Sequence, residues 1–211
     1  MLDQKKDLPE GVSMFMATLF RMKHIHRWSL MRNNDQENVM EHSWMVSAVA
    51  HSLTVLQNEL EPETQVDSGK VVLLALYHDA SEVMTGDLPT PVKYHNPQLK
   101  GAFKELESLA SQRLLDQLPA GIQEPYRDLC LGDESSLEGQ LVKAADKISA
   151  WLKCIEERRM GNLEFRSAEK STLKAVQDLG LPCVEAWMNL FAPAFELSLD
   201  ELHGKGEHPS S

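Results

Sequence analysis

The fold is decided by the stretch from Lys70 to Pro91, which reads KVVLLALYHDASEVMTGDLPTP. Its first seven residues are almost entirely apolar, and its last six contain one glycine and two prolines. Apolar residues here recur at spacings of three and four rather than in alternation, which is the period of an amphipathic helix. We therefore predict a helix over residues 68–84 that is closed by Gly86, because glycine commonly follows the last helical turn.

Three titratable side chains come together at the end of this predicted helix. His78 falls on the same helical stripe as Val71 and Leu74. Asp79 is its neighbour, and Glu82 follows it four residues later. Burial without partners would cost on the order of several kcal/mol for each uncompensated charge. A solvated helix end is one interpretation, and a site in which a metal ion neutralises these groups is the other.

Helical spacing continues along the rest of the chain, and the alternation typical of strands never persists. Asn38 with Glu41 three residues later forms a capping-box pattern. The predicted helices begin at or near Ser13, Asn38, Ser68, Asn96 and Ser135, and further helices cover residues 163–179 and 183–191. The helix from Ser135 stops before Gly161 and has this core stripe: Leu141, Ala145, Ile148, Leu152 and Ile155. We predict an all-α fold, a single helical bundle over residues 1–202, with a disordered tail over 203–211.

The composition narrows the class of protein. The chain has 211 residues and a formal net charge of −11, which argues against a nucleic-acid polymer as partner. Cys130, Cys154 and Cys183 are an odd number without a CxxC pair, which predicts free thiols. No stretch approaches the about 18 apolar residues of a membrane span, and the N-terminus lacks the apolar segment of a signal peptide. We expect a soluble cytoplasmic protein without a membrane partner.

Two more polar residues lie on or beside predicted core faces. His42 precedes Val46 by four residues, at the head of an apolar stripe, where a neutral imidazole would need a partner. Asp146 comes directly after the core stripe in LVKAADKISAWL, although it could instead pair with Lys143 or Lys147 on a solvated face. Together with His78 and Asp79, these residues would supply two imidazoles and two carboxylates. Such a set suits an octahedral first-row divalent metal with positions left open for water and substrate.

Several segments make the chain similar to a known family. They are MEHSWMVSAVAH at 40–51, ALYHDASEVMTGDLPTPVKY at 75–94, LVKAADKISAWLKCIEE at 141–157, FRMKHIHRWSLMRN at 20–33 and FAPAFELSLDEL at 191–202. The chain resembles the HD-domain metal-dependent phosphohydrolases, and within them the bacterial 5′-deoxynucleotidase branch. The spaced H…HD…D pattern marks the superfamily, whereas the HDASE-x3-GDLPTP block with an upstream Arg-Trp pair is more specific.

The resemblance implies roles for individual residues. It implies the metal ligands His42, His78, Asp79 and Asp146. It implies the catalytic residues Glu82 and Arg27, although Glu82 could instead orient His78 as a neighbouring carboxylate. It implies these substrate-binding residues: Arg27, Trp28, His42, Asp79, Asp87, Leu88, Pro89, Thr90 and Asp146. By residue type alone, Arg27 would be a surface cation and Trp28 a core residue. The remaining histidines are expected to bind no metal or substrate, and they are His24, His26, His51, His95, His203 and His208. Of these, His24 and His26 could line the pocket rim.

The function implied by the resemblance is hydrolysis of deoxyribonucleoside 5′-monophosphates by a single-domain HD enzyme with one divalent metal ion. Co²⁺ or Mn²⁺ is expected, with Zn²⁺, Cu²⁺ and Fe²⁺ left open, and relatives imply a homodimer. One alternative is an HD phosphohydrolase for another nucleotide, such as a triphosphate, a cyclic nucleotide or an alarmone. The other is a helical interaction module that binds metal without catalysis.

Overall fold

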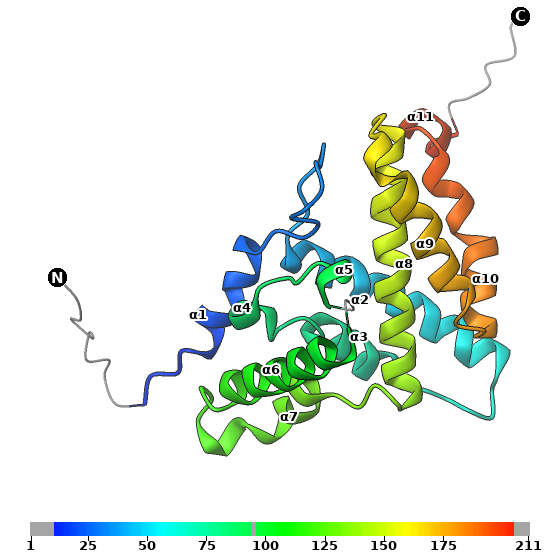
Figure 1. Ribbon diagram of the computed structural model, residues 1–211. Coiled ribbons are helices and arrows are strands. Elements are labelled where there is room, and N and C mark those ends of the chain that lie inside the picture. The colour runs from blue at the N-terminus through cyan, green and yellow to red at the C-terminus, as the bar shows by residue number, and fades with distance from the viewer. Residues whose placement is uncertain (1–10, 94–95, 205–211) are drawn as a thin grey trace, which may run out of the picture.

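Helices make up the regular structure of this protein (Figure 1). The computed structural model describes residues 11–93 and 96–204, and within them the one pairing of strand type is an isolated antiparallel bridge between His26 and Asn38. The α-helices are α1 Phe15–Leu19, α2 Val39–Leu60, α3 Ser68–Tyr77, α4 Glu82–Thr85, α5 Thr90–Lys93, α6 Pro97–Leu115, α7 Glu124–Leu131, α8 Leu137–Arg159, α9 Arg166–Gln177, α10 Pro182–Leu190 and α11 Leu199–Leu202. Short 3₁₀ helices are η1 Phe20–His24, η2 Ala120–Ile122, η3 Leu163–Phe165 and η4 Ala192–Glu196. The all-α prediction is confirmed.

Two apolar clusters hold these helices together. The larger one joins α2, α3, α8, α9 and α10, and it contains the whole stripe predicted for α8. The smaller one joins α1, η1 and α6 to the start of α2 and to the segment after α3. In Figure 1, α8 and α9 run side by side at the right and α6 packs beside α7 at the lower left. The long helices α2 and α3 connect the two halves, so residues between the clusters are well placed to form a site.

The predicted start of α2 is correct in detail. Asn38 accepts hydrogen bonds from the backbone N–H groups of Met40 and Glu41, and Glu41 accepts one from the Asn38 N–H, which completes the capping box. This cap fixes where the first turn of α2 begins. His42 therefore lies in a defined position, fully buried, one turn before the core residue Val46.

The predicted helix over residues 68–84 is wrong as a continuous element. The α3 helix ends at Tyr77, and α4 begins only at Glu82, before Gly86 closes it with a φ of +70°. His78 explains the break, because its Nδ1 donates to the carbonyl oxygen of Ala75 at 2.7 Å. In a continuous helix that oxygen would accept from the N–H of Asp79. The residues between the helices follow a tighter path, and the Ala80 N–H donates to the Tyr77 carbonyl oxygen.

The other predicted helices differ less from the structure. The first is short, since α1 gives way to η1 after Leu19, and Phe15, Leu19 and Met22 of these two elements are buried. Asn96 caps α6, and Ser136 rather than Ser135 caps α8. All three cysteines are free thiols, as predicted. The predicted tail falls mainly on residues 205–211, which lie outside the described residues.

A buried ion pair in α8 anchors the segment that leads into α2. Glu157 is fully buried and accepts from Lys153 Nζ at 2.8 Å, from the Asn34 N–H at 2.9 Å and from Asn162 Nδ2 at 2.7 Å. Lys153 also donates to the Asp35 carbonyl oxygen. The last turns of α8 therefore hold residues 34–35, only a few positions before the cap of α2.

Replacing Glu157 with glutamine is expected to lower the free energy of unfolding by about 3 kcal/mol, because Lys153 would keep a buried charge without its counter-charge. Urea denaturation of the metal-free protein measures the change. The matched control is Asp178→Asn, which removes the exposed ion pair with Lys174 at the same i,i+4 spacing. We expect that control to cost at most about 0.5 kcal/mol. Equal losses in the two variants would contradict the anchoring role.

Acid titration measures the same contact in a second way. Burial alone would raise the pKa of Glu157, but the hydrogen bonds it accepts, first that from Lys153, lower it from 4.5 to about 2. Because the pKa in the folded state is depressed, the stabilisation is fully present above pH 4.5 and is lost as the pH falls toward about 2. The difference in unfolding free energy between wild type and Glu157→Gln should shrink across this window. A difference that stays constant would count against the assignment.

Candidate metal centre and active site

The predicted metal ligands come from three separate parts of the chain. His42 is in the first turn of α2, between Val39 of the smaller apolar cluster and Val46 of the larger one. His78 and Asp79 are in the turn after α3, and Asp146 is in the middle of α8. The predicted ligands therefore lie where the two apolar clusters meet, and their backbones are held by packing on both sides.

These side chains converge. His42 Nε2 is 3.0 Å from Asp146 Oδ1, and the rings of His42 and His78 have centroids 5.5 Å apart. Among the described residues, one group of three or more could hold a metal ion, and its ligand atoms all lie within 4.8 Å of one another: His42, His78 and Asp146. The alternative in which Asp146 pairs only with a neighbouring lysine does not explain its contact with His42. Three of the four predicted ligands thus form a group of metal-binding geometry.

Asp79 lies at the edge of this group. Its Oδ2 is 3.1 Å from His78 Nε2, 3.8 Å from His42 Nε2 and 3.2 Å from Arg27 Nη1. Burial would raise the pKa of Asp79, but the charges of His78 and Arg27 hold it far below its usual value. The carboxylate is therefore ionised and lies within reach of both imidazoles.

The imidazole nitrogens are oriented for a cation. Because a carbonyl oxygen can only accept, the His78 Nδ1 that contacts Ala75 carries a proton, so Nε2 is the nitrogen that can bind a metal ion once it is deprotonated. This Nε2 is buried and has no hydrogen bond of acceptable geometry, although Asp79 is close. Burial would lower the pKa of His78, but the charge of Asp79 raises it to about 9, so a metal ion would bind in place of the Nε2 proton. An unsatisfied buried nitrogen beside two ionised carboxylates fits a divalent metal ion.

Glu82 is the most perturbed carboxyl group of the site. It is buried, and its Oε2 has no hydrogen-bond partner. Burial, followed by the charges of Asp79 and Asp87, raises the pKa of Glu82 to about 10. The continuous helical stripe expected to link Glu82 to His78 is absent, because the turn after Tyr77 intervenes. Glu82 nevertheless stays in the electrostatic field of Asp79, and it holds a proton at neutral pH.

Arg27 is not a surface cation. Its side chain is only 12% exposed, and it contacts Asp79 as well as Glu37 Oε2, the latter at 3.3 Å from Nε. Burial alone would lower the pKa of Arg27, but these two carboxylates raise it. The segment before α2 thus places a permanently charged, planar donor beside the proposed metal ligands, where it can meet phosphate oxygens.

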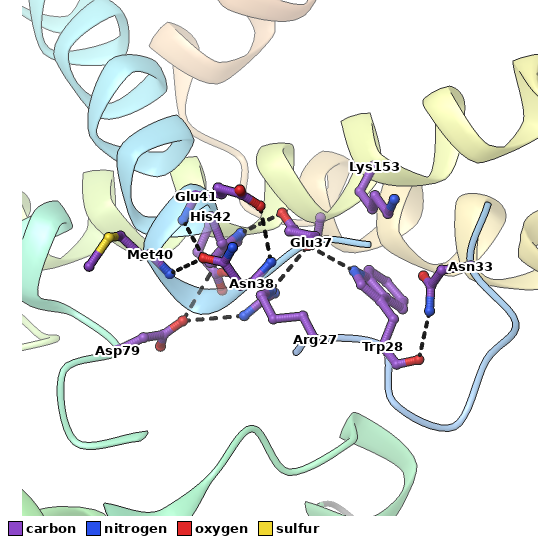
Figure 2. Close-up of polar contacts among 12 residues, drawn as sticks. Arg27, Trp28, Asn33, Glu37, Asn38, Met40, Glu41, His42, Asp79 and Lys153 are labelled. Atoms are coloured by element: carbon purple, nitrogen blue, oxygen red, sulfur yellow. Dashed lines mark hydrogen bonds and ion pairs between the residues drawn. The ribbon is translucent and has the colours of Figure 1, made fainter. Parts of the chain in front are cut away.

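Trp28 combines a packing role with an unusual backbone. Its ring lies 5.3 Å from that of Phe165, and its Nε1 donates to Glu37 Oε2 at 3.1 Å. Its φ of 57° is the positive value of a left-handed conformation, which costs a bulky residue about 1–3 kcal/mol. Asn33 Nδ2 donates to its carbonyl oxygen at 3.2 Å (Figure 2). The Met31 N–H donates to the same oxygen at 2.9 Å, and together these bonds hold the turn. Such local strain is common where a side chain must be aimed at a ligand.

The loop expected to recognise the sugar of the substrate follows Gly86. Asp87 is half-buried, and burial raises its pKa against the opposing charge of Arg27, so it belongs to the same electrostatic cluster. Leu88 and Pro89 are half-buried, and Thr90 is exposed at the start of α5. That these residues recognise the sugar stays a prediction.

The histidines left without a role are exposed where the structure describes them, namely His24, His26, His51 and His203, while His95 and His208 lie outside the described residues.

Glu37 was not among the site residues predicted from the sequence. Figure 2 shows this residue at the centre of the polar contacts, between Arg27, Trp28 and His42. Its side chain is only 6% exposed, and its Oε1 lies 3.3 Å from His42 Nδ1. Burial would raise the pKa of Glu37, but the contacts with His42 and Arg27 lower it, so the group is ionised. The available signal was a carboxylate directly before the cap of α2 and five residues before a predicted ligand.

Comparison with solved structures identifies the fold. A crystal structure of an HD-domain phosphohydrolase from Listeria innocua matches with a TM-score of 0.72 at 24% identity, covering 91% of this chain and 96% of that one. The cyanophage S-2L HD phosphohydrolase DatZ, bound to dA and one catalytic Zn²⁺ ion, matches with a TM-score of 0.60 at 20% identity, covering 85% and 95%. At these identities the likeness concerns the fold, which is that of the HD-domain phosphohydrolases.

The sequence comparisons then identify the family. The family described as 5′-deoxynucleotidase YfbR-like matches residues 14–195. A 5′-deoxynucleotidase from Vibrio vulnificus is 47% identical over 191 residues, which cover 90% of this chain and 98% of that protein. A 5′-deoxynucleotidase from Yersinia pestis is 46% identical over 194 residues, covering 90% and 97%. The chain belongs to the YfbR-like 5′-deoxynucleotidase family.

Proposed function

We propose that this protein hydrolyses deoxyribonucleoside 5′-monophosphates to the deoxyribonucleoside and phosphate. The observation that carries the proposal is the convergence of His42, His78 and Asp146 beside Arg27 and the protonated Glu82, in a chain of this family. The relatives named above are 5′-deoxynucleotidases, and the cyanophage HD phosphohydrolase of the same fold is bound to dA and one catalytic Zn²⁺ ion. The enzyme is a phosphoric monoester hydrolase.

A divalent metal ion fits the donor set, with His42, His78, Asp79 and Asp146 as the residues that would hold it. Two nitrogens and two carboxylates suit a first-row ion, and Co²⁺ or Mn²⁺ is our proposal for its identity. When bound, such an ion supplies Lewis acidity toward the phosphate and lowers the pKa of water. The convergence of His42, His78 and Asp146, with Asp79 Oδ2 3.1 Å from His78 Nε2, supports this assignment.

The remaining steps are assigned to Arg27 and Glu82. Arg27 binds the phosphate oxygens and stabilises their charge as water attacks phosphorus. The bond between phosphorus and the 5′ oxygen breaks, and that oxygen needs a proton to leave as an alcohol. Glu82 holds a proton at neutral pH and is buried, so it can donate this proton as a general acid.

Selection of the sugar is assigned to the loop after Gly86. Asp87 would accept a hydrogen bond from a sugar hydroxyl, and Leu88, Pro89 and Thr90 would shape the space around the 2′ carbon. Two prolines restrict this loop, because each fixes its own φ. Trp28 would pack against the sugar or base. The homodimer and the cytoplasmic location stay predictions; in the described residues, no helix is both long and apolar enough to cross a bilayer.

The test measures phosphate release together with chromatography of the products from a matched panel of dAMP, AMP, dATP and cyclic AMP, with the metal-free protein reconstituted in Co²⁺ or Mn²⁺. Chromatography is needed because hydrolysis of cyclic AMP to AMP, or removal of triphosphate from dATP, releases no free phosphate. We expect release from dAMP, slower release from AMP and little from the other two. Equal rates on dAMP and AMP would overturn the deoxyribose preference. A preference for dATP or cyclic AMP would favour the second class of HD phosphohydrolase. Metal binding without any release would favour the helical module that binds metal without catalysis.

A further inference from the structure

Glu37 contacts three of the residues assigned to the site. Its Oε1 lies 3.3 Å from His42 Nδ1, while its Oε2 accepts from Arg27 Nε at 3.3 Å and from Trp28 Nε1 at 3.1 Å (Figure 2). One carboxylate therefore links a proposed metal ligand, through one oxygen, to both proposed substrate-binding residues, through the other.

The backbone around Glu37 is held as firmly as its side chain. The Arg27 N–H donates to the Glu37 carbonyl oxygen at 3.0 Å, and the Val39 N–H donates to the Ile25 carbonyl oxygen at 2.9 Å. The residue next in sequence, Asn38, caps α2. The Glu37 carboxylate is thus held in a fixed position, and its contacts restrain the side chains that it binds.

We propose that Glu37 is a positioning residue: it fixes the tautomer of His42 and the orientation of Arg27 and Trp28. The proposal deepens the function proposed above and rests on it for the roles of these partners. An ionised carboxylate can only accept, so Glu37 keeps a proton on His42 Nδ1. Asp146 accepts from Nε2 in the same way, and a metal ion would bind in place of the Nε2 proton while the Nδ1 proton stays between His42 and Glu37. Carboxylates that bind the second nitrogen of a metal-binding histidine commonly act in this way.

Glutamine at position 37 separates this role from a packing role. Its amide matches the carboxylate in shape, but it has one acceptor and one donor end. With its oxygen toward Arg27 and Trp28, both of those hydrogen bonds are kept. Its NH₂ group then faces His42 Nδ1, which must accept rather than donate. The proton of the neutral ring is then on Nε2, where Asp146 accepts it, and it occupies the position through which His42 would bind the metal ion.

The matched control is Glu41→Gln. Glu41 is exposed, lies directly before His42 and accepts only a backbone hydrogen bond of the capping box. Glutamine is equally acceptable at that position of the box. The control therefore removes the same charge four residues further along the chain, in the first turn of α2, without a change in the contacts of His42.

The experiment titrates the metal-free wild type and the variants with Co²⁺ by calorimetry and records Tm without metal. For Glu37→Gln we expect the Kd for Co²⁺ to rise about 10–100-fold, with KM for dAMP at saturating Co²⁺ changed less than about threefold. The Tm of the metal-free variant should stay within about 4 °C of wild type, because all of its hydrogen bonds can be formed. Glu37→Ala removes the acceptors on both sides, and its KM should also rise by roughly tenfold.

Three results would overturn the proposal. One is a Co²⁺ Kd for Glu37→Gln within twofold of wild type. Another is an equal rise in Glu41→Gln, which would indicate a general effect of charge. The third is loss of the folded state in metal-free Glu37→Gln, which would make the residue structural. If the wild type releases no phosphate from dAMP, the proposed function fails, whereas the Co²⁺ titration still tests whether Glu37 positions His42.

Discussion

Replacing Glu82 with glutamine is expected to lower kcat for phosphate release from dAMP by about 10²–10⁴-fold, the usual contribution of a general acid. The pKa of Glu82 is raised to about 10, so the wild-type group is neutral at pH 7. Glutamine reproduces its shape and its neutrality but has no acidic proton. Steady-state kinetics with saturating Co²⁺ measures the loss.

The Co²⁺ affinity and the Tm of Glu82→Gln should match those of wild type, since Glu82 is outside the group of converging ligand atoms. Glu124→Gln provides a control, because its side chain is 84% exposed at the start of α7. A parallel loss of Co²⁺ affinity would instead assign Glu82 to the metal ligands. An unchanged kcat would show that another group supplies the proton.

Replacing Asp146 with asparagine is expected to remove metal binding and to reduce phosphate release on the order of 10³-fold, because a bound metal supplies several kcal/mol of charge stabilisation. Metal binding should also be visible as stability. At a Co²⁺ concentration of 100 times Kd, the wild type should gain about 2.7 kcal/mol in unfolding free energy. Asp146→Asn should gain almost none, which thermal unfolding with and without Co²⁺ measures.

Lys147→Ala is the control for Asp146→Asn. It tests the alternative interpretation of the sequence, in which Asp146 only pairs with a neighbouring lysine on a solvated helix face. If that interpretation held, both variants would change stability alike and Co²⁺ would stabilise both. We expect Lys147→Ala to keep the full stabilisation by Co²⁺, because Asp146 contacts His42 at 3.0 Å.

Much of the framework could be predicted from local patterns. The core stripe of α8 is buried along its whole length, and Asn38 caps α2 as its spacing with Glu41 indicated. Both features depend on residues within one helix, where a period of 3.6 residues or a fixed cap spacing decides the outcome. The same stripes predicted that His42 and Asp146 lie on or beside core faces, whereas their contact is a tertiary one between α2 and α8.

Predictions failed where a side chain competes with the backbone. The periodicity from Ser68 to Met84 is helical throughout, yet His78 bonds the Ala75 carbonyl oxygen and the helix ends at Tyr77. Periodicity counts apolar positions and contains no information about such a hydrogen bond. The expectation of Arg27 as a surface cation failed for a related reason, because its burial depends on Glu37 and Asp79, distant in sequence and close in space.

The sequence by itself determined the helical class, the caps, the buried stripes and, through its motifs, the family and the candidate ligands. Only the tertiary structure decided that Glu37 links His42 to Arg27 and Trp28, and that the pKa of Glu82 is raised. The physical reason is that apolar spacing acts within a helix, whereas a pKa or a tautomer depends on charges and donors from other segments. Those segments meet only when the two apolar clusters pack around α2 and α3.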